Sequence, residues 1–75
     1  MITVYTKNNC ASCTFTKRKL QELGVNYQER NIDEVPEDLE YLMLCGLRSL
    51  PVVFKGNELL VAGGNAPNLL ETIVS

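Results

Sequence analysis

The sequence contains no histidine and only three cysteines, Cys10, Cys13 and Cys45, among its 75 residues. A structural zinc site needs four ligands, usually cysteine or histidine, so one chain cannot complete such a site. An odd number of cysteines in a short chain is also a poor basis for a framework of structural disulfides. The cysteines are therefore expected to act through their reactivity or to be buried as small apolar side chains.

The chain also lacks long apolar runs and clustered positive charge. No stretch of about 18 apolar residues occurs, so no segment is expected to span a membrane. The seven Lys and Arg residues are dispersed and the net charge is −2, which argues against nucleic acid as the main partner. The first residues, MITVYTKNN, lack the pattern of a signal peptide. We expect one cytoplasmic domain covering residues 1–75.

Local patterns predict an α/β domain with the element order β-α-β-α-β-β-α. Strand-favouring segments occur at residues 2–6, 25–32, 51–54 and 58–61. Helix-favouring segments occur at residues 11–23, from 36 until a glycine at 46, and from 65 onward. A helical crossover makes the first two strands parallel, and a tight turn at residues 55–57 makes the last two antiparallel. We expect a four-stranded mixed sheet flanked by three helices.

The spacing and position of Cys10 and Cys13 indicate redox chemistry. The pair lies between the first expected strand and the first expected helix, where backbone N–H groups and the helix dipole favour thiolate over thiol at Cys10. Lys7, Lys17 and Arg18 are candidates to add positive charge, and no acidic residue occurs in residues 1–21. Cys10 is thus the expected nucleophile and Cys13 the resolving thiol. A Cys-x-x-Cys spacing that arises by chance and has no role is the alternative.

Four motifs together resemble the glutaredoxin family of the thioredoxin fold, and most of all its NrdH-type redoxins. They are YTKNNCASC at 5–13, TKR at 16–18, VPED at 35–38 and GLRSLPVV at 46–53. The resemblance implies a thioredoxin-like fold and a monomeric dithiol–disulfide oxidoreductase without a tightly bound cofactor. It further implies electron donation to class Ib ribonucleotide reductase or other disulfide proteins. Electrons would come from thioredoxin reductase, or from glutathione in a glutaredoxin-like protein.

The same resemblance implies a substrate-binding loop at Leu50 and Pro51. In this family the peptide bond before the matching proline is cis, and the proline faces the two cysteines. The backbone of Leu50 would then pair with a substrate peptide near Cys10 in the manner of an added strand.

A second set of binding residues is implied by glutaredoxins that bind glutathione. Lys7 matches a lysine that contacts the glutathione carboxylate, and Gly63, Gly64 and Asn65 match the segment that holds the γ-glutamyl end. NrdH-type redoxins instead carry Trp-Ser-Gly-Phe at this place, and the present chain has no tryptophan. The front of the chain is therefore NrdH-like and the glycine pair glutaredoxin-like.

The sequence leaves two other functions open. One is a glutathione-dependent glutaredoxin that reduces mixed disulfides. The other is an iron–sulfur cluster carrier, in which two chains each supply Cys10 and glutathione completes the ligand set. Cys45, beside Met43 and Leu44 near the end of the second expected helix, is interpreted as a buried apolar side chain.

Overall fold

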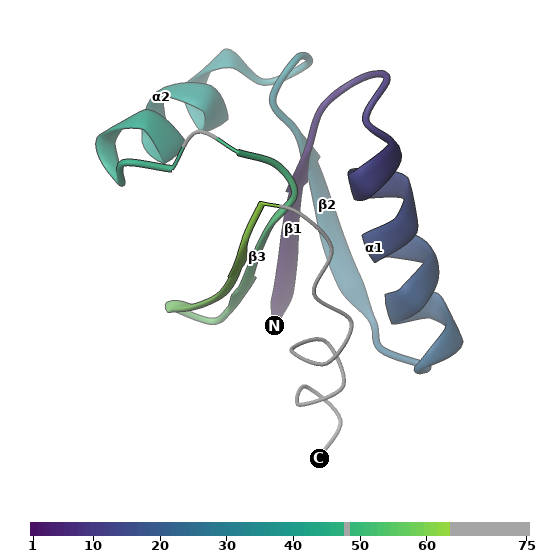
Figure 1. The fold of residues 1–75 in the computed structure, drawn as a ribbon. Helices are drawn as coiled ribbons and strands as arrows, with labels where there is room; N and C mark the ends of the chain where they lie inside the picture. The colour runs from purple at the N-terminus through teal and green to yellow at the C-terminus, as the bar shows by residue number, and fades with distance from the viewer. Residues whose placement is uncertain (48, 64–75) are drawn as a thin grey trace.

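The computed structural model describes residues 1–47 and 49–63 of the chain (Figure 1). The elements are, in order, β1 (Ile2–Thr6), α1 (Ala11–Glu22), β2 (Tyr27–Asn31), α2 (Pro36–Leu44), β3 (Val52–Lys55) and β4 (Glu58–Ala62). This order confirms the expected β-α-β-α-β-β arrangement. The third helix, expected from Asn65 onward, lies outside the described residues. Within the described residues, neither helix is long and apolar enough to cross a membrane.

The four strands form one mixed sheet in the order β2-β1-β3-β4. β1 pairs with β2 in parallel, so that Thr6 lies opposite Asn31 at the carboxyl ends of both strands. β3 is antiparallel to both β1 and β4. The sequence predicts the mixed sheet, and the structure adds that β1 is a central strand. The chain therefore leaves β1 and enters α1 next to the end of β2.

The two helices pack on opposite faces of the sheet (Figure 1). Successive side chains of a strand point to opposite faces, and in β1 the buried Ile2 and Val4 join Leu20 of α1 in the hydrophobic core. Tyr5, the residue after Val4, faces the other side of the sheet and contacts Tyr41 of α2 at a ring-centroid distance of 6.1 Å. One face of the sheet thus anchors α1, which carries the cysteines, and the other face meets α2.

α1 begins and ends where its sequence predicts. Cys10 is the N-cap residue, with extended backbone. At the other end Gly24 has a φ of +71°, a left-handed conformation that glycine adopts without a steric penalty. The N–H of Val25 then donates to the carbonyl of Leu20 at 3.0 Å. Because this bond belongs to the end of the helix, β2 starts at Tyr27 rather than at the expected residue 25.

The expectation that Cys45 is buried is wrong, because its side chain is exposed. α2 is short, and its buried residues are Asp38 and Leu42. Cys45 is the C-cap residue one position after the helix, beyond the turn that faces the sheet. Its position next to apolar residues in the sequence therefore does not place it in the core.

Candidate active site

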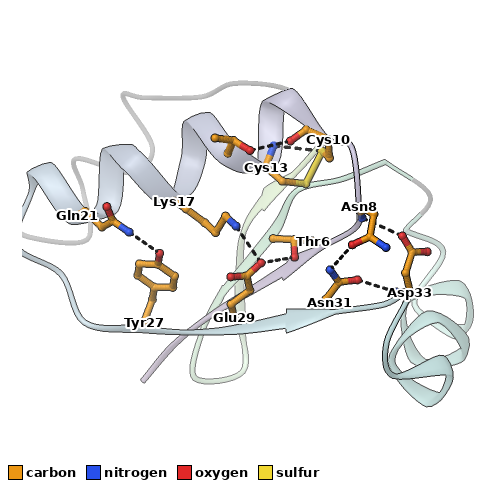
Figure 2. A network of polar contacts seen from close by, with 11 residues as sticks. Thr6, Asn8, Cys10, Cys13, Lys17, Gln21, Tyr27, Glu29, Asn31 and Asp33 are labelled. Atoms are coloured by element: carbon orange, nitrogen blue, oxygen red, sulfur yellow. Dashed lines mark hydrogen bonds and ion pairs between the residues drawn. A yellow bond between two sulfur atoms is a disulfide. The ribbon is translucent and has the colours of Figure 1, made fainter.

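Cys10 and Cys13 form a disulfide at the start of α1 (Figure 2). Their Cα atoms are 5.3 Å apart, within the range usual for a disulfide. The N–H of Cys13 donates to the Cys10 sulfur at 3.2 Å, so the sulfur takes the place of an N-cap oxygen. A thiolate formed here on reduction is favoured by that hydrogen bond and by the positive end of the helix dipole. The expected position of Cys10 at the start of the first helix, with a backbone N–H directed at its sulfur, is confirmed.

The two sulfurs differ in accessibility. Cys13 is 1% exposed, because it lies on the side of α1 that faces the sheet, with Thr16 and Leu20. Cys10 is partly exposed. Of the two sulfur-bearing residues, Cys10 is therefore the more accessible to solvent, while Cys13 is enclosed one helical turn further on.

The loop that presents Cys10 is held by the end of β2 (Figure 2). The N–H of Asn8 donates to the Asp33 carboxylate at 2.8 Å. The side-chain amide of Asn31 donates to the Asn8 side-chain oxygen at 3.0 Å and accepts from the Asp33 N–H at 2.8 Å. Asn9 follows with a φ of +56°, a conformation that asparagine tolerates better than most residues. These bonds set the path of the chain into Cys10.

A polar surface hollow, here called the cysteine hollow, opens beside the disulfide. Its volume is about 660 Å³. Its lining combines the loop before α1, the first turns of α1 and the end of β2: Lys7, Asn8, Asn9, Cys10, Ala11, Cys13, Thr14, Lys17, Glu29 and Asn31. The sequence suggests no acidic residue near the cysteines, but the fold adds the carboxylate of Glu29 to this lining.

Lys17 and Arg18, both expected to add positive charge near Cys10, are separated by the helix. Lys17 lines the cysteine hollow and pairs with Glu29, with its Nζ 3.0 Å from Oε2. Arg18 lines a different hollow with Phe15, Lys19 and Glu22. Successive residues on a helix point about 100° apart, so only one of the two side chains can face β2.

The Glu29 carboxylate is held by two donors. Thr6, a buried residue of β1, donates from Oγ1 to Oε2 at 2.8 Å, and Lys17 donates to the same oxygen. The hydrogen bond from Thr6, followed by the contacts with Lys17, lowers the pKa of Glu29 against the opposing effect of burial. Glu29 is therefore an anion at neutral pH.

This carboxylate should make the stability of the oxidised protein depend on pH. Because the folded pKa lies below the ordinary value of 4.5, Glu29 contributes stability above that pH and loses it as the pH falls through the folded pKa. Glu29→Gln should therefore be destabilising at pH 7, by under about 1 kcal/mol since the group is partly exposed. Urea denaturation at neutral and acidic pH measures the difference, which should shrink in acid; a difference that grows in acid would contradict the assignment.

A second, more apolar hollow lies on the other side of Lys7. We call it the apolar hollow; its volume is about 460 Å³. It is lined by Lys7, Ile32, Leu39, Leu42, Met43, Leu47 and Leu50. Lys7 lines both hollows, so the two expected binding residues Lys7 and Leu50 come together here, next to the cysteine pair.

The loop at Pro51 is tied to the end of β4. The Leu50–Pro51 peptide bond is cis, which confirms the expectation from the family resemblance. The N–H of Gly63 donates to the Pro51 carbonyl at 2.7 Å, and Gly63 has a φ of +89°. A Cβ at Gly63 would overlap that of Ser49. The positive φ and this close approach together account for a glycine at position 63. Gly64 and Asn65 lie outside the described residues.

Sequence reasoning missed Asn8, Glu29, Asn31 and Asp33. The signal that could have found three of them is the parallel pairing of the first two strands, which brings the carboxyl ends of both strands to one edge. Among the described residues, no group of three or more His, Cys, Asp or Glu side chains could hold a metal ion.

Comparison with known proteins agrees with the site. Residues 2–60 match the family model of glutaredoxin. The glutaredoxin-like protein NrdH of Escherichia coli strain K12 is 39% identical over 72 residues, which covers 96% of this chain and 86% of that protein. The NrdH protein of Lactococcus lactis subsp. cremoris is 46% identical over 55 residues, covering 73% of this chain and 76% of the relative.

Solved structures show the same fold. The NrdH-redoxin of Escherichia coli superposes with a TM-score of 0.87 at 38% identity, covering 96% of this chain and 92% of that one. A glutaredoxin from Archaeoglobus fulgidus gives a TM-score of 0.77 at 28% identity, covering 99% and 86%. The fold is thus thioredoxin-like, as expected. The chain therefore belongs to the glutaredoxin family and is an NrdH-like thiol–disulfide oxidoreductase.

Proposed function

We propose that this chain reduces disulfide bonds of other proteins, with Cys10 as the nucleophile and Cys13 as the resolving thiol. The observation that carries the proposal is the hydrogen bond from the Cys13 N–H to the Cys10 sulfur at the start of α1. It favours the anionic sulfur at the more accessible of the two cysteines. The buried Cys13 is then available only to a partner already attached to Cys10.

The reaction has two exchange steps. The Cys10 thiolate attacks one sulfur of the substrate disulfide, and the other substrate sulfur leaves as a thiolate and takes up a proton. Cys13 then loses its proton and attacks the Cys10 sulfur, which releases the second substrate thiol. The product is the Cys10–Cys13 disulfide seen in the structure. Two electrons and two protons from a reductase restore the dithiol.

Substrate binding is assigned to the loop and hollow next to Cys10. The apolar hollow is proposed to take side chains that flank the substrate disulfide, and Lys7 at its edge to contact a carboxylate. The backbone of Leu50 would pair with the substrate segment in an extended conformation. Pro51 and Gly63, joined by a hydrogen bond, support this loop from behind.

The proposed electron source is thioredoxin reductase, and the proposed acceptor is a cytoplasmic class Ib ribonucleotide reductase. The support comes from the NrdH-type relatives, since the Escherichia coli NrdH-redoxin has been described as having a thioredoxin-like activity profile. In this scheme the cysteine pair itself carries the electrons, and no bound cofactor takes part.

A coupled assay tests the electron source. The protein is supplied with a protein disulfide and NADPH, either with thioredoxin reductase or with glutathione and glutathione reductase. We expect NADPH oxidation that depends on this chain in the first mixture, at least about tenfold faster than in the second. Turnover only with glutathione would replace the proposal by a glutathione-dependent glutaredoxin.

The acceptor needs a separate measurement. Class Ib ribonucleotide reductase is assayed for deoxyribonucleotide formation with thioredoxin reductase, NADPH and this chain. Product formation should saturate with increasing concentration of the chain. Reduction of a general protein disulfide without any support of the ribonucleotide reductase would leave the redox activity in place and exclude this acceptor.

A further inference from the structure

The Lys17–Glu29 pair shares the cysteine hollow with the reactive sulfurs but takes no part in the exchange steps described above. Lys17 lies one helical turn after Cys13, and Glu29 lies on the neighbouring β2. Figure 2 shows their charged groups meeting in the space between α1 and β2, on the same side of the helix as the disulfide. The Lys17 Nζ lies 3.0 Å from the Glu29 Oε2, and Thr6 donates a hydrogen bond to the same carboxylate oxygen.

Reduction changes the charge of this hollow. In the oxidised protein the cysteines are neutral, and the Lys17 ammonium has Glu29 as its partner. Two electrons and one proton convert the disulfide into one thiol and one thiolate, which adds a negative charge at Cys10. That charge and the Glu29 carboxylate then both attract the single ammonium of Lys17, since all three groups line one hollow.

We propose that Lys17 and Glu29 act as a positioning pair that sets how readily Cys10 becomes a thiolate. Lys17 favours the thiolate through its charge. Glu29 holds the ammonium in the cysteine hollow and offsets part of that charge, so that the two effects oppose one another. The inference rests on the proposed role of Cys10 as nucleophile.

The other charges around the cysteine hollow and the loop that leads to Cys10 are unchanged in this comparison. Lys7 comes from the loop before α1 and lines the same hollow. Asp33 follows β2, and its carboxylate accepts from the Asn8 N–H. Neither contacts Lys17 or Glu29 in any hydrogen bond or ion pair recorded among the described residues. The pair can therefore be altered without removing the loop contacts that position Cys10.

The test uses a background with Cys13→Ser and Cys45→Ser, in which Cys10 is the only thiol. The absorbance of the thiolate at 240 nm is followed against pH, and the midpoint is compared between variants. Glu29→Gln should lower the midpoint by about 0.5–1 unit, because it leaves the Lys17 charge unopposed. Lys17→Gln should raise it by about the same amount. The double variant should return close to the background value.

Matched controls use a different side of the same helix. Arg18→Gln removes a positive charge next to Lys17 in the sequence, and Glu22→Gln removes a carboxylate, but both residues line another hollow. Neither should move the midpoint by more than about 0.2 units, because exposed charges outside the hollow are screened. Thermal unfolding of each variant separates a loss of stability, which a purely structural pair would show, from a shift of the thiolate.

Three results would overturn the inference: no shift in either single variant, shifts of the opposite sign, or equal shifts in the Arg18 and Glu22 controls. The same titration distinguishes a failure of the positioning pair from a failure of the proposed function. If Cys10 in the background protein titrates like an ordinary thiol, its role as an activated nucleophile fails. If it titrates lower but ignores Lys17 and Glu29, only the positioning pair is excluded.

Discussion

Cys10→Ser is expected to abolish disulfide reduction, with the rate falling by at least about a thousandfold. A serine hydroxyl at this position is not ionised at neutral pH and does not attack a disulfide, whatever the helix dipole contributes. The hydrogen bond from the Cys13 N–H can be made to a serine oxygen as well, so the fold should persist. Turnover of a protein disulfide in the assay with thioredoxin reductase measures the loss.

Two other cysteine variants make the result specific. Cys45→Ser removes an exposed thiol at the end of α2 and should leave the rate within about twofold. Cys13→Ser should still attack but should stop at the mixed disulfide between Cys10 and the substrate, which mass spectrometry can detect. Residual activity above about a tenth in Cys10→Ser, or an equal loss in Cys45→Ser, would show that another thiol starts the reaction.

The second large effect is expected at Gly63. Gly63→Ala should lower the free energy of unfolding by about 2–4 kcal/mol, the sum of a left-handed conformation and an overpacked contact. The residue has a φ of +89°, and the added methyl group would overlap the side chain of Ser49. Because Ser49 precedes Leu50 and Pro51, relief of the overlap should also displace the proposed substrate-binding loop. Urea denaturation of the oxidised protein measures the loss.

Gly56→Ala provides the matched control for the backbone term. Gly56 also has a positive φ, of +60°, but a Cβ there meets no atom within 4 Å. The expected loss is therefore only about 1–2 kcal/mol, from conformation alone. Equal losses in the two variants would mean that the Ser49 loop moves aside without cost, and that Gly63 is not required by close packing.

The glutathione contact that the family resemblance implies at Gly63 is affected by this result. In the resemblance to glutathione-binding glutaredoxins, the glycine pair belongs to the ligand site. Here the positive φ, the bond to the Pro51 carbonyl and the approach of Ser49 already account for a glycine at 63. A glycine at this position is therefore no evidence by itself for binding of the tripeptide.

Much of the local structure could be predicted because its causes are local. The strand at 2–6, the start of α1 after Cys10 and the left-handed glycine at its end all depend on residues within a few positions of one another. The same holds for the contact between the Cys13 N–H and the Cys10 sulfur, which spans three residues. The redox interpretation of the cysteine pair follows from these neighbours, since a helix start favours an anion.

Contacts between distant residues were decided only by the tertiary structure. The bond between Thr6 and Glu29 and that between Asn31 and Asn8 each span 23 residues, and both exist because β2 pairs in parallel with the central strand β1. Residue order along one segment does not reveal which neighbouring strand a side chain will face. The local sequence pattern therefore could not predict that the Glu29 carboxylate lies beside the cysteines, or that Cys45 is exposed.

The sequence by itself determined the order of the described elements, the place of the two cysteines and the chemistry available to them. The tertiary structure alone decided which of two adjacent basic residues, Lys17 or Arg18, faces the cysteines and which carboxylate opposes its charge. The physical reason is range: caps, turns and sulfur reactivity depend on nearby atoms, whereas the electrostatic surroundings of a sulfur depend on every element that packs around it.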